Sequence, residues 1–257
     1  MMARDQRGLA LVSVLWGVAI LSLIAAAMRL EAVTSAQIDR NVWNATRAGA
    51  IADVAVNRAI LTLMDNRTGR MPRVDGTRAV VAVDGIAVRL WIQNESGKIN
   101  LNAADKSLLQ SLFASAGLAD SEAAALADRV VARRPAPGGS APLAYRAVDD
   151  LLSVPGMTPA LYGRVAPALT VFGRAATPDQ SVAPRDVLRV LPGMSELGIA
   201  EILKQRDEAA PSTGPAGAQS DYLVTAQARV AGAQVVRTTV VAFTGDPAKP
   251  YLILAWR

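Results

Sequence analysis

The chain has 257 residues, contains neither cysteine nor histidine, and carries a net charge of +5. The absence of these two residue types excludes a Ser-His-Asp or Cys-His nucleophile, a histidine general base, a disulfide and the usual zinc ligands. No Walker A, GxGxxG or GxSxG motif is present either, so we predict a protein that is not an enzyme.

Residues 9–28 form an apolar stretch of twenty residues without a charge, LALVSVLWGVAILSLIAAAM. At about 1.5 Å of rise per residue, a helix of this length spans roughly 30 Å, the thickness of a bilayer hydrocarbon core. We therefore predict a transmembrane helix. The basic leader MMARDQRG precedes it directly and ends in Gly8.

Three interpretations fit this N-terminus. A secretory signal peptide would be cleaved near the small residues 25–27, and an uncleaved signal anchor would keep its basic residues in the cytoplasm. A prepilin-type leader would be cleaved between Gly8 and Leu9, so that the apolar helix stays in the mature chain. We favour the third interpretation because residues 29–65 contain no proline and a single glycine, and continue the helical pattern.

The second half of this predicted helix carries small apolar residues at helical spacing. They are Ala45, Ala48, Ala52, Ala55, Ala59 and Leu63. A helix over about residues 9–65 would be roughly 85 Å long, with a break expected in the Asn-Arg-Thr-Gly cluster at residues 66–69. The alanine stripe suits two roles. It can contact a partner helix, for which we expect Ala45, Ala48, Ala52 and Ala55, or it can pack beneath the protein's own sheet.

Two β-branched runs are joined by Asp84-Gly85, a pair that predicts a hairpin because a type I′ turn needs positive φ at both positions. An alternating pattern at residues 222–230 predicts a third strand, and turns at Gly232-Ala233 and at residues 244–247 lead into two more. The expected strands are residues 78–83, 86–92, 222–230, 234–243 and 251–256. We expect a single antiparallel sheet packed on the second half of the long helix.

The pattern between residues 102 and 220 is helical, with Asn102 expected to cap the first helix and Asp105 in its first turn. An internal repeat pairs LLSVPGMTPALYGRVAPAL with VLRVLPGMSELGIAEILKQ. Each copy resembles a helix-hairpin-helix unit, in which backbone amides hold a nucleic acid phosphate, but Thr158 and Ser195 replace the second glycine of that hairpin. We favour two helical hairpins that form a protein interaction surface and keep DNA binding as the alternative.

Four features together resemble the minor pseudopilin K family of the type II secretion system. They are the RG leader before the apolar helix, GKINLN at residues 97–102, DDLLSVPGM at residues 149–157, and the sheet-forming C-terminus. The resemblance implies an α+β, type IV pilin-like fold with an inserted all-helical domain. The expected divisions are a leader at 1–8, a transmembrane helix at 9–28, a pilin-like helix and first strands at 29–101, the inserted domain at 102–220 and the C-terminal strands at 221–257.

The resemblance also implies a non-enzymatic subunit at the tip of the periplasmic pseudopilus. Its partners would be minor pseudopilins I and J, the major pseudopilin and the prepilin peptidase, and the new amino terminus at Leu9 would be methylated. The chain would sit in the bacterial inner membrane with its N-terminus in the cytoplasm. Ser13 stands where most pilin-like chains carry glutamate, as the resemblance implies for a tip subunit with no neighbour above it. Nucleic acid is then not an expected partner.

Calcium in the helical domain is a further implication of the resemblance. Calcium takes about six to eight oxygen ligands, yet residues 133–143, RRPAPGGSAPL, contain no acidic residue. Asp149 and Asp150 remain as candidate ligands, although we expect one of them to cap a helix. No other cofactor is predicted.

Overall fold

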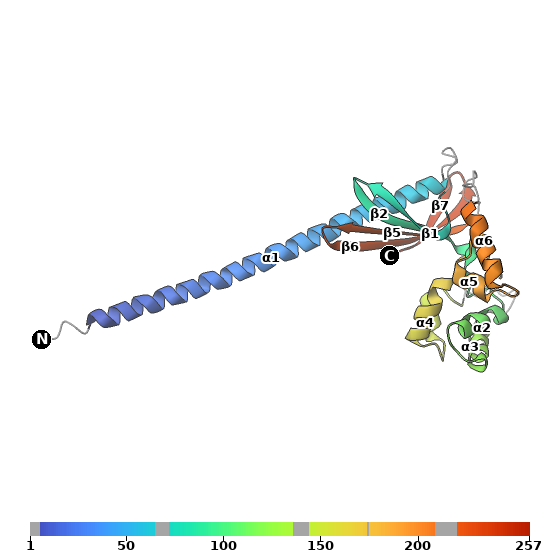
Figure 1. Ribbon diagram of the computed structural model, residues 1–257, viewed down its shortest axis with the longest axis horizontal. Helices are drawn as coiled ribbons and strands as arrows, with labels where there is room; N and C mark the ends of the chain where they lie inside the picture. Colours follow the sequence, from blue (N-terminus) through green and yellow to red (C-terminus); the bar gives the residue numbers. More distant parts are fainter. Residues whose placement is uncertain (1–5, 65–71, 136–143, 174, 209–219) are drawn as a thin grey trace.

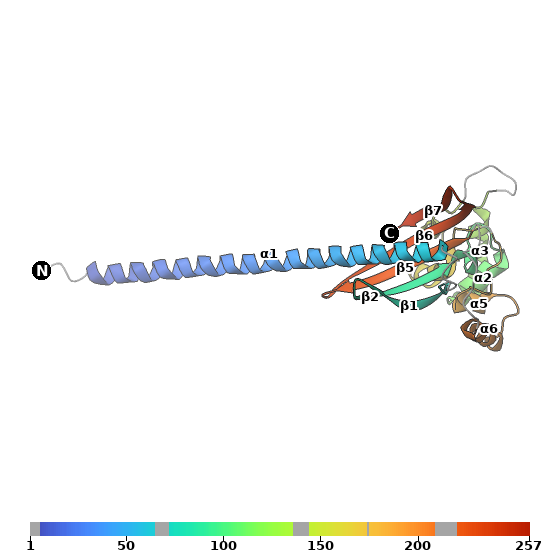
Figure 2. The same ribbon diagram turned by 90° about the horizontal axis from the view of Figure 1, so that it is seen from above.

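The computed structural model describes residues 6–64, 72–135, 144–173, 175–208 and 220–257. In these residues a single long helix, α1 (Gln6–Met64), lies along one face of a five-stranded sheet, and shorter helices gather at the far end of that sheet (Figures 1 and 2). The predicted mixture of helix and antiparallel sheet is confirmed. The expected break at residues 66–69 lies outside the described residues.

The two halves of α1 have different surroundings. Its N-terminal half projects from the rest of the protein, whereas its C-terminal half packs mainly on two central strands of the sheet (Figure 2). The predicted membrane segment, residues 9–28, belongs to the projecting half. The side chains of residues 6–11, 26–27 and 30–36 lie outside the described residues.

Within the part of the chain that the structure describes, no helix is long and apolar enough to cross a membrane.

The sheet has the order β1-β2-β5-β6-β7 and all its pairs are antiparallel. Its strands are β1 (Asp75–Val83), β2 (Ile86–Asn94), β5 (Asp221–Val230), β6 (Ala233–Asp246) and β7 (Lys249–Trp256). The β1–β2 hairpin is confirmed, since Asp84 and Gly85 have φ of 49° and 74°. The β5–β6 turn is Ala231-Gly232, one residue earlier than expected, because these two residues have the positive φ values that the tight turn requires.

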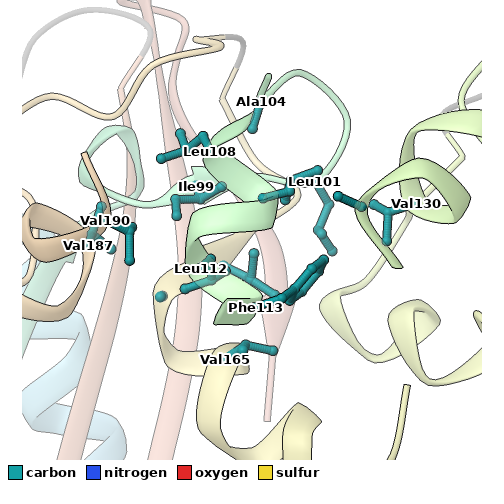
Figure 3. Packing of buried hydrophobic residues seen from close by; sticks show 14 of the residues in the cluster. Ile99, Leu101, Ala104, Leu108, Leu112, Phe113, Val130, Val165, Val187 and Val190 are labelled. Atoms are coloured by element: carbon teal, nitrogen blue, oxygen red, sulfur yellow. The ribbon is translucent and has the colours of Figure 1, made fainter. Parts of the chain in front are cut away.

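A second hydrophobic core lies in the helical region, which we define as residues 99–208. Its elements are α2 (Lys106–Ser115), α3 (Asp120–Ala132), α4 (Pro159–Val165), α5 (Arg185–Val190), α6 (Glu196–Glu208), the 3₁₀ turns η3 (Val148–Ser153) and η4 (Ala166–Ala168), and the short parallel pair β3 (Ile99–Asn100) and β4 (Leu169–Thr170). Figure 3 shows how Leu112 and Phe113 of α2 meet side chains from the neighbouring elements. The two cores share no residue among those described.

Asn102 does not cap α2. That position belongs to Asp105, which makes no side-chain capping bond, and the backbone between residues 100 and 104 first forms a turn that buries Leu101 and Ala104. The Asn102 side chain instead bonds the backbone of Tyr145 in both directions, at 2.9 and 3.1 Å. The prediction failed because Asn102 finds a partner 43 residues away, which no local pattern reveals.

The GKINLN segment forms the junction between the sheet and the helical region. After β2, the 3₁₀ turn η2 (Glu95–Gly97) holds Gly97 against the backbone of Val182. Lys98 Nζ lies 2.7 Å from Glu95 Oε1 in a buried ion pair. Asn100 Nδ2 donates to two carbonyl oxygens, of Phe172 and of the residue after it, at 3.1 and 3.0 Å. The motif therefore serves to join two packed units.

Candidate protein-interaction surface

The alanine stripe of α1 faces the protein's own sheet. Ala48, Ala52 and Ala55 are 0%, 0% and 1% exposed and belong to the core beneath the sheet, while Ala45 is half-buried. Small side chains let the helix backbone approach the strands closely. The expected partner contact therefore does not apply to the three buried alanines, because their side chains are covered within the folded chain. The alternative, packing beneath the protein's own sheet, describes them.

The opposite face of α1 is exposed and carries apolar residues among polar ones. Four apolar residues recur here at i, i+7, i+11 and i+18, which places them on the side of the helix turned away from the buried alanines. They are Trp43, Ala50, Val54 and Leu61. The three large side chains, of Trp43, Val54 and Leu61, are 70%, 51% and 61% exposed. We call these four residues the outer stripe. Three large exposed apolar side chains on one side of a helix that already has its own core favour this side as a surface for a second helix.

The projecting half of α1 extends this apolar character. Every large apolar side chain that is described there is more than half exposed: Val12, Val14, Leu15, Trp16, Val18, Ile20, Leu21, Leu23, Ile24, Met28, Ile38 and Val42. No strand or helix among the described residues covers this half (Figure 1). Exposing this many apolar side chains to water is unfavourable, so we expect another molecule to bury this surface too. The predicted cleavage site, Gly8 and Leu9, lies at its start, and the side chains there lie outside the described residues.

A further exposed apolar set lies on β7, the last strand of the sheet. Its members are Tyr251, Leu252, Ile253, Leu254 and Trp256, each at least a third exposed. Because β7 pairs on one side only, with β6, its other edge is open within the described residues. Edge strands of this kind can accept contacts from another chain.

The two Pro-Gly-Met turns have matching local structures. Gly156 and Gly193 have φ of 93° and 75°. The amides of Met157 and Met194 donate to the carbonyl oxygen three residues earlier, at 3.0 and 3.3 Å. These amides are therefore engaged within the chain, whereas a phosphate cradle requires free ones.

The hydroxyl residue after each Pro-Gly-Met turn caps a helix. Thr158 Oγ1 accepts the amide hydrogen of Leu161 at the start of α4, at 3.2 Å. Ser195 Oγ accepts that of Gly198 at the start of α6, at 3.1 Å. Ser and Thr are favoured at this position because their hydroxyl oxygen accepts a hydrogen bond from a first-turn amide that has no partner within the helix. The hydroxyl in place of the hairpin's second glycine thus has a structural role.

The candidate calcium ligands bind other parts of the protein. Asp150 Oδ2 accepts the amide hydrogens of Arg146 and Ala147, at 2.7 and 3.0 Å, and these backbone hydrogen bonds lower its pKa. The expected capping role of one aspartate is confirmed. Asp149 accepts a hydrogen bond from the Tyr162 hydroxyl and lies 3.6 Å from Arg257. No cluster of three or more potential metal ligands occurs in the described ranges.

The fold and these surfaces define a mixed helix-and-sheet protein with a long, partly uncovered N-terminal helix and an antiparallel sheet. No protein-family model matches the sequence, and no curated protein does. Among solved structures, the chain is similar to one described as the GspK-GspI-GspJ complex from the enterotoxigenic Escherichia coli type 2 secretion system. The TM-score is 0.49 at 12% sequence identity, and the similarity covers 88% of this chain and 98% of the other.

Proposed function

We propose that this protein is a minor pseudopilin of a type II protein secretion system. It is a non-enzymatic subunit that assembles with minor pseudopilins I and J at the tip of the periplasmic pseudopilus. The GKINLN and DDLLSVPGM segments, which resemble those of pseudopilin K, support this proposal from the sequence.

The observation that carries the proposal is the two-sided character of α1. One face is buried beneath the protein's own sheet through Ala48, Ala52 and Ala55. The other face carries the outer stripe, with Trp43 70% exposed. A helix that anchors its own domain and offers a second apolar face suits a subunit that packs side by side with other long helices.

The position of the helical region supports a place at the tip. This region lies at the end of the sheet remote from the N-terminus of α1 (Figures 1 and 2). A bulky unit there would obstruct close stacking of a further subunit above it. We propose that residues 102–220 form the inserted domain between residues 29–101 and 221–257 of a pilin-like unit.

The membrane anchor and its processing are part of the proposal. Residues 9–28 cross the inner membrane, with the leader 1–8 in the cytoplasm and the folded part in the periplasm. The prepilin peptidase cleaves between Gly8 and Leu9, so sequencing of the purified chain should begin at Leu9. The uncharged run of twenty residues supports the proposal that residues 9–28 span the membrane. Prepilin-type processing, the major pseudopilin as a neighbour and methylation of Leu9 follow from the family resemblance. No observation favours the DNA-binding alternative.

Co-purification tests the proposed assembly. The full chain in an uncharged detergent should co-purify with minor pseudopilins I and J, and Leu61→Glu should abolish this, because it places a charge within an apolar helix contact. Leu61 is 61% exposed, so the unfolding midpoint should change little. Leu197→Glu is the matched control, since Leu197 is 85% exposed on α6, in the helical region.

Each outcome has a distinct meaning. If the unsubstituted chain does not co-purify with either subunit, the proposed function is wrong. If Leu197→Glu disrupts the complex and Leu61→Glu does not, the partners bind the helical region and the outer stripe has another role. Ala52→Glu should behave differently from both, since an unpaired charge at a fully buried site unfolds the domain.

A further inference from the structure

The face of the sheet that points away from α1 carries a row of arginines. Side chains alternate along a strand, and the buried residues Val88, Leu90 and Ala226 face α1. Arg89, between Val88 and Leu90, and Gln227, which directly follows Ala226, therefore face the opposite way. We call this second side the outer sheet face.

Three arginines of the outer sheet face come from three adjacent strands. In the register of the sheet, Arg78 on β1 lies opposite Trp91, Arg89 on β2 lies opposite Gln227, and Arg229 on β5 lies two residues beyond Gln227. Each arginine is thus the diagonal neighbour of the next. Diagonal neighbours are within reach of each other's long side chains. The strands therefore bring together three cations that are far apart in sequence.

These arginines contact only neutral groups among the described residues. Arg89 Nη1 lies 3.5 Å from Gln227 Oε1, and Arg229 Nη2 lies 3.0 Å from Gln234 Oε1. The guanidinium of Arg78 lies over the ring of Trp91, 5.4 Å from its centre.

On the inner face of the same sheet, by contrast, an arginine is paired with a carboxylate. Arg237 lies there and forms an ion pair with Asp53 at 2.9 Å. Acidic residues are scarce in the strands that carry the three outer arginines. There is none in residues 225–238, and residues 78–91 contain only Asp84, which lies in the hairpin turn. Glu95 and Asp149 border this face beside Trp91 and Thr238, but no carboxylate among the described residues forms an ion pair with Arg78, Arg89 or Arg229. These three arginines therefore leave positive charge on their part of the outer sheet face.

A hollow of about 280 Å³ lies between two of these cations. It is lined by Val80, Ala87, Arg89, Gln227, Arg229 and Gln234. The site thus combines two guanidinium groups and two amides with a small apolar floor. Guanidinium groups bind carboxylates through paired hydrogen bonds, and side-chain amides can donate to the same oxygens.

We propose that the outer sheet face binds a carboxylate-rich segment of a partner protein, with Arg89 and Arg229 as its main contacts. The surface lies on the other side of the sheet from α1 and is separate from the outer stripe, so the inference goes beyond the proposed function. It rests on that function only where a lipid headgroup is compared as the occupant.

Two other anionic partners fit this surface less well. The sheet begins to cover α1 near Ala48, twenty residues after Met28, which puts it about 30 Å from the proposed bilayer and its headgroups. A nucleic acid strand gains much of its affinity from bases stacked on open aromatic rings, and Arg78 already covers the ring of Trp91.

Fluorescence anisotropy with a labelled hexaglutamate peptide tests this proposal on the full chain in an uncharged detergent. The double variant Arg89→Gln/Arg229→Gln should bind the peptide about tenfold more weakly or worse, because it loses two charge-assisted contacts. Arg146→Gln/Arg164→Gln is the charge-matched control, since both arginines are exposed in the helical region. The control should bind as the unsubstituted chain does, and salt should weaken both alike.

Three results would overturn the inference. The first is no binding of hexaglutamate by the unsubstituted chain. The second is an equal loss in the control variant, which would mean that the peptide responds to net charge alone. The third is that a soluble short-chain phosphatidylglycerol binds through Arg89 and Arg229 while hexaglutamate does not, which would identify a lipid headgroup as the occupant. Circular dichroism of each variant checks that it is folded.

Discussion

Replacing Gly97 with alanine should loosen the junction between the sheet and the helical region. A Cβ atom at this position would lie 2.6 Å from the carbonyl oxygen of Val182, 2.7 Å from its carbonyl carbon and 2.8 Å from the amide nitrogen of Ala183. All three are backbone atoms, so no side chain can rotate away. The φ of Gly97 is not in the left-handed region, and the cost therefore comes from this contact alone.

The size of the effect follows from the contacts at the junction. The two segments must separate by several tenths of an ångström, and overpacking of this kind costs about 1–3 kcal/mol. The same shift would stretch two hydrogen bonds, from Gln93 Nε2 to Val182 O at 2.9 Å and from Asp179 N to Ser96 O at 2.8 Å. Each such bond contributes about 1 kcal/mol. We expect a loss of about 2–4 kcal/mol in the free energy of unfolding.

Urea denaturation of the full chain in an uncharged detergent, followed by far-ultraviolet circular dichroism and tryptophan fluorescence, measures this loss. Gly163→Ala is the matched control, because Gly163 lies in α4 and a Cβ there would meet nothing within 4 Å. Alanine should leave that helix unchanged or stabilise it by up to about 1 kcal/mol. Equal stability of Gly97→Ala and Gly163→Ala would refute the close contact at the junction.

The remaining predictions concern a helix cap and a titration. Thr158→Ala and Ser195→Ala should each lower the free energy of unfolding by about 1 kcal/mol through loss of an N-cap, whereas Thr158→Ser should retain most of it. Equal losses in the serine and alanine variants, measured by urea denaturation, would argue against capping. Burial, and then the hydrogen bond to Asp149, raise the pKa of Tyr162 to about 12 from an ordinary value of 10.0. Its contribution to stability should therefore be intact below pH 10 and be lost as the pH rises through about 12. Asp149→Asn should lower the tyrosinate midpoint in an absorbance titration, and an unchanged midpoint would assign the shift to burial alone.

Local patterns determined much of this fold. The Asp84-Gly85 pair predicts its hairpin because only a few residues accept positive φ at adjacent positions. The helix that continues past the apolar segment follows from the absence of helix breakers between residues 29 and 65. The period of two over residues 222–230 predicts strand β5, because alternation reflects one buried face. These features depend on neighbours in sequence, which is why a single chain is enough to find them.

The tertiary structure decided what covers each face. The spacing of Ala48, Ala52 and Ala55 predicts a stripe, but periodicity does not reveal whether a partner or the chain's own sheet lies on it. The outer stripe was missed because Trp43, Val54 and Leu61 are separated by polar residues and become a surface only once the opposite face is buried.

Long-range pairing decided the rest. The row of Arg78, Arg89 and Arg229 depends on β2 pairing with β5, across more than a hundred residues of intervening chain. Asn102 and Gly97 likewise owe their roles to Tyr145 and Val182, which are remote in sequence. The sequence by itself therefore determined which segments form helices and strands, because those choices depend on local backbone and side-chain preferences. Only the tertiary structure decided which surfaces remain for a partner, because that depends on contacts between segments that no local pattern encodes.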